Sequence, residues 1–205
     1  MNKKMYSIIS NSLILVLGII GLVYSFIEFG VLAFQYYTVD SNIFLMVTSA
    51  LHLFYSLKGK IPNYVRLLRY YSICAISVTL VVVLLILGPM TGSFAGYIWI
   101  LINGSMLYQH TLCPIIAIVS FSLFEGNYKL VKKDSLKALI PTLIYAVVII
   151  VLNLVYVVDG PYPFLKIYDQ HFLLTILWGV IILGGAYGLA LLCKFLNYKG
   201  NFEKK

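Results

Sequence analysis

The sequence predicts an all-α polytopic membrane protein: one domain, residues 1–205, forming a bundle of six transmembrane helices with both termini in the cytoplasm. Three observations predict this class: a very apolar composition, six long apolar segments, and basic residues gathered in alternate connections. The chain is 61% hydrophobic and only 11% charged, with a mean hydropathy of +0.96, whereas soluble domains are about 25% charged.

Each of the six apolar segments is long enough to cross a bilayer, whose hydrocarbon core is about 30 Å thick and needs about 20 helical residues. They cover residues 5–29, 37–57, 70–87, 97–124, 138–158 and 171–193. The fourth segment contains no Lys, Arg, Asp or Glu. The sixth contains Gly179, Gly184, Gly185 and Gly188, and we expect these small residues to let helices pack closely.

The basic residues predict the orientation. Fourteen of the fifteen lie before the first segment, between the second and third, between the fourth and fifth, or after the sixth, and Lys166 is the exception. The positive-inside rule places these four regions in the cytoplasm. The same placement explains the net charge of +8 without a nucleic-acid partner. We therefore expect an integral membrane protein, located in the cell membrane if the chain is bacterial.

Other classes of site find no support in the sequence. Cys74, Cys113 and Cys193 lie far apart in apolar runs, so they predict neither a metal site nor a disulfide framework. No nucleotide-binding or metalloprotease motif is present, and we expect no cofactor. The sequence leaves the oligomeric state open.

Two apolar segments carry polar residues that lipid cannot satisfy. Thr38, Asn42, Ser49 and His52 follow one face of the second segment at helical spacing, and such a face is expected to pack inward or to line a cavity. We expect His52, near the inner edge, to be interfacial. The fourth segment holds His110 at membrane depth, where an ionisable residue is usually functional.

Two further features concern the neighbourhood of His110. Pro114, four residues on, has no N–H for the His110 carbonyl, so we expect the helix to kink there. By helical rise, Thr38 lies about 30 Å and His110 about 22 Å from the inner edge of the membrane, so the two residues differ in depth by about 8 Å. Helix tilt and boundary errors can close this gap.

The short motifs resemble those of a known family. Residues 37–42, Tyr-Thr-Val-Asp-Ser-Asn, and 109–114, Gln-His-Thr-Leu-Cys-Pro, look like the two signatures of the androgen-induced gene family, and Pro-Tyr-Pro-Phe at 161–164 resembles a further family element. This family includes the androgen-dependent TFPI-regulating protein and bacterial six-span relatives. The resemblance implies an intramembrane threonine hydrolase of fatty acid esters of hydroxy fatty acids, with Thr38 as nucleophile and His110 as its partner. Val39, Asp40 and Cys113 depart from the usual family pattern.

The residues themselves leave two functions open. In a hydrolase of lipid esters, Thr38 attacks the ester carbonyl while His110 accepts the proton, and Asn42 or Gln109 stabilises the oxyanion or orients the substrate. The candidate cavity-lining residues are Pro114, Ser49, Tyr162 and Phe164, although an interfacial aromatic belt is the favoured interpretation of the last two. The alternative is a small membrane transporter or lipid-binding protein without catalysis, since mid-membrane polar residues and a broken helix also mark substrate pathways. A non-catalytic scaffold subunit is a third interpretation.

Overall fold

The fold is all-helical, as the sequence predicted. The computed structural model describes residues 2–126 and 128–202, and these residues form helices and no strand. The elements are α1 (Lys3–Phe29), η1 (Gly30–Gln35), α2 (Tyr37–Leu57), α3 (Asn63–Val82), η2 (Val83–Leu87), α4 (Gly88–Met90), α5 (Phe94–Ile102), η3 (Leu107–Leu112), α6 (Cys113–Phe124), α7 (Lys132–Lys137), α8 (Ile140–Leu154), η4 (Pro163–Leu165) and α9 (Phe172–Phe202). Lys204 and Lys205, which contributed to the predicted orientation, lie outside the described residues.

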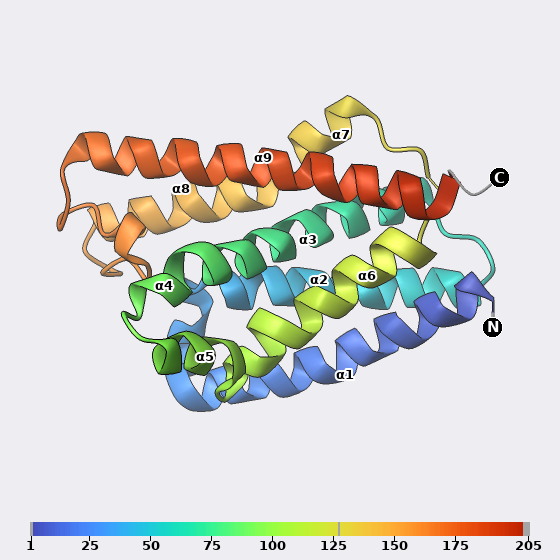
Figure 1. The fold of residues 1–205 in the computed structure, drawn as a ribbon, viewed down its shortest axis with the longest axis horizontal. Helices are drawn as coiled ribbons and strands as arrows, with labels where there is room; N and C mark the ends of the chain where they lie inside the picture. The colour runs from blue at the N-terminus through green and yellow to red at the C-terminus, as the bar shows by residue number, and fades with distance from the viewer. Residues whose placement is uncertain (1, 127, 203–205) are drawn as a thin grey trace.

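Long helices run between two ends of the bundle. Helices α1, α2, α3, α6, α8 and α9 extend along the long axis, and α2 packs against both α1 and α3 (Figure 1). The beginning of α1, the end of α9 and the connections 58–62 and 128–131 lie at one end, here called the basic end because most of the described Lys and Arg residues gather there. The opposite end carries α4, α5 and the connection 155–171.

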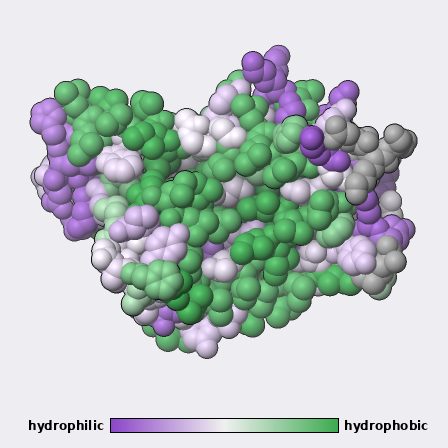
Figure 2. Space-filling view, viewed as in Figure 1, coloured by the Kyte–Doolittle hydropathy of each residue, from purple (hydrophilic) through white to green (hydrophobic). Residues whose placement is uncertain are grey.

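Five helical segments are long and apolar enough to cross a membrane. They cover Lys3–Gln35, Asn63–Met90, Leu107–Phe124, Lys132–Leu154 and Phe172–Asn201. Figure 2 shows hydrophobic residues over the middle of the visible face, with hydrophilic residues towards its two ends. These helices are characteristic of an integral membrane protein.

Helix α2 is not among these five. It is 21 residues long, but the polar stripe predicted from the sequence lowers its hydropathy. Seven polar side chains of α2 are buried in the bundle: Thr38, Ser41, Asn42, Thr48, Ser49, His52 and Ser56. They therefore face neighbouring helices, where they find partners that lipid does not offer.

The segment 97–124 is divided into two helices, contrary to the expected single helix. Helix α5 ends at Ile102, and Gly104 adopts a φ of +50°, in the left-handed region that glycine tolerates. Glu28 of α1 holds the turn: Ser105 donates its backbone N–H over 3.3 Å and its hydroxyl over 2.7 Å to the Glu28 carboxylate. We expected a kink next to Pro114, but the break lies about ten residues earlier in the chain, at Gly104.

The helix restarts as a π-helical turn, η3, which leads into α6. The Cys113 N–H bonds to the carbonyl of Tyr108, five residues earlier. This wider turn precedes Pro114, and it relieves the clash of the proline ring with the carbonyl four residues earlier. The π-helical turn contains His110, so it also sets the direction of that side chain.

A buried ion pair lies towards the basic end. Arg69 of α3 is only 1% exposed, and its Nε and Nη2 lie 2.9 Å and 3.2 Å from the two oxygens of Glu125. Asn11 and Ser120 donate to the same carboxylate, and Arg69 donates to Ser49. Ser49 thus belongs to this network, and its predicted place in the wall of the site cavity is wrong.

Candidate functional site

Thr38 and His110 are in direct contact. Thr38 Oγ1 lies 3.3 Å from His110 Nε2, and the two residues are only 7% and 8% exposed. The gap of about 8 Å expected from helical rise is closed because α6 runs obliquely across the bundle (Figure 1) and the π-helical turn carries His110. The structure therefore brings together the threonine and histidine that the two motifs placed on separate helices.

The second ring nitrogen of His110 determines where its proton lies. His110 Nδ1 is 2.7 Å from the carbonyl oxygen of Ile100. A carbonyl can only accept, so Nδ1 carries the hydrogen and donates it. In the neutral ring, Nε2 is then an acceptor directed at the Thr38 hydroxyl. This is the arrangement that a general base requires.

The break after α5 supplies this carbonyl. The last carbonyls of a helix have no partner within the helix, and α5 ends two residues after Ile100. His110 bonds to Ile100, and the hydroxyl of the neighbouring Thr111 donates to the Leu101 carbonyl over 2.7 Å. The sequence revealed no third member of the catalytic set, and in the structure the Ile100 carbonyl orients the histidine. An unpaired backbone group of this kind leaves no signal in side-chain motifs.

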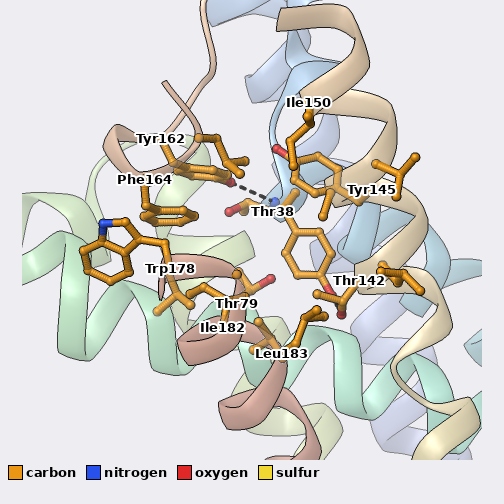
Figure 3. A pocket seen from close by; sticks show the side chains of 18 of the residues that line it. Thr38, Thr79, Thr142, Tyr145, Ile150, Tyr162, Phe164, Trp178, Ile182 and Leu183 are labelled. Carbon is orange, nitrogen blue, oxygen red and sulfur yellow. Dashed lines mark hydrogen bonds between the residues drawn. The ribbon is translucent and has the colours of Figure 1, made fainter. Parts of the chain in front are cut away.

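Thr38 is the second residue of α2, in the first helical turn. Backbone N–H groups in a first turn have no helical acceptor and carry a partial positive charge. The Thr38 N–H points to the hydroxyl of Tyr162, 3.4 Å away (Figure 3). The hydroxyl of Thr38 is therefore close to two polar hydrogens, its own N–H and the Tyr162 O–H.

Tyr162 is buried beside Thr38. It is 8% exposed, and its ring stacks on Phe164 with centroids 5.2 Å apart; Phe164 packs in turn on Trp178 of α9 (Figure 3). Burial raises the pKa of Tyr162 to about 12, so the phenol keeps its proton at neutral pH. Both Tyr162 and Phe164 line a cavity beside Thr38, which is where the second of the two sequence interpretations placed them.

A largely apolar cavity of about 200 Å³ opens beside Thr38 (Figure 3). Its walls come from the start of α2, from α3, α8 and α9, and from the connection before α9. None of its described lining residues belongs to α6. His110 is not part of the wall, so it contacts the Thr38 hydroxyl from outside the cavity.

The roles expected for Asn42 and Gln109 change. Asn42 Nδ2 donates to the carbonyls of Thr38 and Gln109, over 2.8 Å and 3.1 Å. Both its amide hydrogens are thereby used, so Asn42 clamps the two motifs together instead of donating to an oxyanion. The Gln109 side chain lies against Gly21 of α1, on the far side from the cavity.

Two other expectations are also corrected. Pro114 is fully buried and does not line the cavity. Four glycines of α9 do not mediate close packing, because no atom of a neighbouring element lies within 4 Å of where a Cβ would stand: Gly179, Gly184, Gly185 and Gly188. Gly200, near the end of α9, is the one that packs closely, against the Ser122 carbonyl. Gly179 instead forms part of the cavity wall.

No cluster of three or more His, Cys, Asp or Glu side chains in the described part of the chain could hold a metal ion. The polar side-chain groups that contact the hydroxyl and the N–H of Thr38 are the His110 imidazole and the Tyr162 hydroxyl. Comparison with models of protein families, with curated proteins and with solved structures finds no match to this chain.

Proposed function

We propose that the protein is an intramembrane hydrolase of lipid esters, with Thr38 as the nucleophile and His110 as the general base. The observation that carries this proposal is the 3.3 Å contact between Thr38 Oγ1 and His110 Nε2, beside a cavity whose walls are largely apolar. A nucleophile with an adjacent oriented base is the arrangement used for acyl transfer.

The reaction proceeds in two steps. His110 Nε2 accepts the Thr38 proton as Oγ1 attacks the ester carbonyl carbon, and the tetrahedral intermediate collapses to acyl-Thr38 while His110 returns the proton to the leaving alcohol. Water then attacks the acyl group with the same assistance, releasing the fatty acid and restoring Thr38. Throughout, the Ile100 carbonyl stabilises the charged imidazole by accepting the Nδ1 hydrogen bond.

Tyr162 supplies the oxyanion donor in this mechanism. Its phenol is protonated, it accepts the Thr38 N–H, and its own hydrogen is available to the oxygen that becomes negative beside Oγ1. The Thr38 N–H, a dipole of the α2 N-terminus, holds the Tyr162 hydroxyl in place. A preorganised donor of this kind contributes about 10²–10³ in kcat.

The proposed substrates are fatty acid esters of hydroxy fatty acids or similar membrane lipid esters. The likeness of the motifs around Thr38 and His110 to those of the androgen-induced gene family supports this class. The cavity of about 200 Å³ is smaller than the pockets that enclose whole drug-sized ligands, about 300–1,000 Å³. It therefore encloses the chain next to the ester, and the remainder of the substrate lies in lipid.

We further propose six membrane crossings, with α2 as the sixth and the basic end in the cytoplasm. The alternating direction of the six long helices supports this topology (Figure 1), and so does the positive-inside rule. A membrane-impermeant thiol reagent applied from outside should label a cysteine placed at Gly92 but not one at Gly59, two positions that are both exposed and free of close neighbours. Labelling at position 59 from outside would contradict the orientation.

A lipid-binding or transport protein without catalysis is the second candidate. One observation favours it: the cavity wall is almost entirely apolar, which suits retention of a lipid as well as hydrolysis. The two functions differ in whether Thr38 forms a covalent bond.

An active-site probe separates the two functions. A lipophilic fluorophosphonate should label the purified protein as Thr38 Oγ1 attacks phosphorus and fluoride leaves, and Thr38→Ala should abolish the label. Thr79→Ala is the matched control, because Thr79 lines the same cavity but shares its hydroxyl with Ser41 at 2.8 Å. If a folded Thr38→Ala protein is still labelled, Thr38 is not the nucleophile, and lipid binding without catalysis becomes the better-supported function.

A further inference from the structure

A second cavity, of about 500 Å³, lies between η1, α2 and α8. It is near the end of the bundle opposite the basic end, where α2 begins (Figure 1). Most of its described lining residues are apolar, and five of those on η1 and α8 are exposed on the outside of the bundle: Val31, Leu32, Phe34, Ile144 and Val148. The second cavity is therefore open to lipid, and its volume is within the usual range for ligand pockets, about 300–1,000 Å³.

This second cavity adjoins the Thr38 cavity but is separate from it. Tyr37 and Tyr145 line both cavities, and their rings pack edge to face with centroids 5.0 Å apart. Thr38 does not line the second cavity. A molecule held there lies on the other side of these two rings from the Thr38 cavity, so the proposed hydrolysis does not use it.

Two polar side chains of the second cavity have no partner in the protein. Gln35 and Asp40 line it and are half-buried, and neither side chain forms a hydrogen bond or an ion pair with another described residue. The other lining hydroxyl groups are bonded within the protein: those of Tyr37, Ser41 and Tyr145. None of the described lining residues is basic. Asp40 therefore gives a largely apolar cavity one uncompensated negative charge, and such a charge is costly to bury without a cation.

We propose that the second cavity binds a membrane lipid whose head group carries a primary amine. The ammonium group donates to the Asp40 carboxylate, while an acyl chain lies along the apolar walls of η1 and α8. The Gln35 amide donates to a phosphate or ester oxygen of the same lipid. Charge and hydrogen bonding select the head group: a carboxylate in apolar surroundings attracts a cation and repels an anion, and a choline head group has the positive charge but no N–H to donate.

Native mass spectrometry of the purified full-length protein in detergent tests this proposal, because it counts the lipids that stay bound. Phosphatidylethanolamine is compared with phosphatidylcholine of the same acyl chains, so the ratio of their affinities isolates the amine hydrogen bond. We expect the wild type to prefer phosphatidylethanolamine about tenfold, the effect of one hydrogen bond to a charged group, and Asp40→Asn to lose this preference. Asp169→Asn is the matched control: it removes an acid at the same end, but Asp169 pairs with Lys166 at 3.6 Å and does not line the cavity.

A second pair of variants tests where the acyl chain lies. Val148→Trp puts a large ring into the second cavity, whereas Val151→Trp puts it on α8 outside both cavities; both positions are about half exposed, so both proteins should fold. Val148→Trp should weaken binding of both lipids at least fivefold, and Val151→Trp should not. Thr38→Ala should leave binding unchanged, so the result does not depend on hydrolysis. Equal affinities of the wild type for the two lipids, an unchanged preference in Asp40→Asn, or equal binding by the two tryptophan variants would overturn the proposal.

Discussion

Two tyrosines in the wall of the Thr38 cavity provide the sharpest test of the proposed mechanism. The Tyr162 hydroxyl faces the Thr38 N–H at 3.4 Å, whereas the Tyr145 hydroxyl donates over 2.7 Å to the carbonyl of Gln35. Both rings line the cavity. Replacing each by phenylalanine removes one hydroxyl and keeps the ring, so the two variants differ only in where the lost hydroxyl pointed.

The structure predicts opposite effects of these two changes. Tyr162→Phe should lower kcat by about 10²–10³, the value of one oxyanion donor, with little change in KM. It should cost at most about 1 kcal/mol of stability, because its bond of 3.4 Å is longer than the usual 2.7–3.2 Å for such bonds. Tyr145→Phe leaves the Gln35 carbonyl unsatisfied, which costs about 1–3 kcal/mol, and should leave kcat unchanged.

The assay is turnover of a fluorogenic fatty ester in nanodiscs, run beside thermal unfolding of each variant. For a chain of this size, 1 kcal/mol corresponds to about 2–4 °C in Tm, so Tyr145→Phe should melt earlier than Tyr162→Phe. A Tyr162→Phe protein that keeps the wild-type kcat would refute the oxyanion role. Equal losses of activity in both variants would show that the Tyr162 hydroxyl has no special role in turnover.

Three further predictions follow from other parts of the structure. Gly179→Leu should fold normally and block turnover, because it adds a side chain to the cavity wall without a clash. Gly184→Leu is equally free of neighbours but lies outside the cavity wall, so it should keep activity. Inactivity of both variants would contradict the assigned cavity. Arg69→Met should destabilise the protein by about 3–5 kcal/mol in thermal or denaturant unfolding by leaving Glu125 unpaired, and adding Glu125→Leu should recover most of this loss. Burial raises the pKa of Glu125, but the charges of Arg69 and His52 and the hydrogen bonds from Arg69 and Ser120 together outweigh burial and lower it to about 2 from its usual 4.5. The stability contributed by this carboxylate should therefore be present above pH 4.5 and be lost as the pH falls towards 2. The Arg69→Met/Glu125→Leu protein should lack this loss, and an unchanged acid transition in that variant would contradict the assignment.

The pairing of Thr38 with His110 was implied by the resemblance of the two motifs to a known family, and the constraint that lipid places on polar residues permitted it. A histidine inside an uncharged segment of 28 residues has few permitted partners, and the polar face of the second segment supplied them. The same constraint predicted that α2 would turn Asn42 inward, although it could not assign the hydrogen bonds of the amide. Hydropathy predicted an all-α fold, and this part of the prediction is confirmed; the six spans and their orientation stay predictions.

The rest depends on backbone geometry that residue types do not specify. The position of the break between α5 and η3 is set by a single glycine, Gly104, and by the distant Glu28. Only after this break does the Ile100 carbonyl become available to His110. The Arg69–Glu125 pair was missed for a related reason: charge counting assigns both residues to the aqueous edge, and their burial becomes favourable only through a network drawn from α1, α2 and α6.

The contrast between Thr38 and Thr48 on the same helix shows why position within α2 decides reactivity. Thr48 lies in the helix interior, donates its hydroxyl to the Leu45 carbonyl at 3.0 Å and bonds Ser72 at 2.6 Å. This is the usual fate of a threonine in a membrane helix, and it leaves no hydrogen for chemistry. Thr38 lies in the first turn, where no helical carbonyl precedes it, so its hydroxyl hydrogen is directed to the unprotonated nitrogen of His110. The helix start thus provides, at one residue, a hydroxyl free of the backbone, a base to accept its proton, and an N–H dipole facing the cavity.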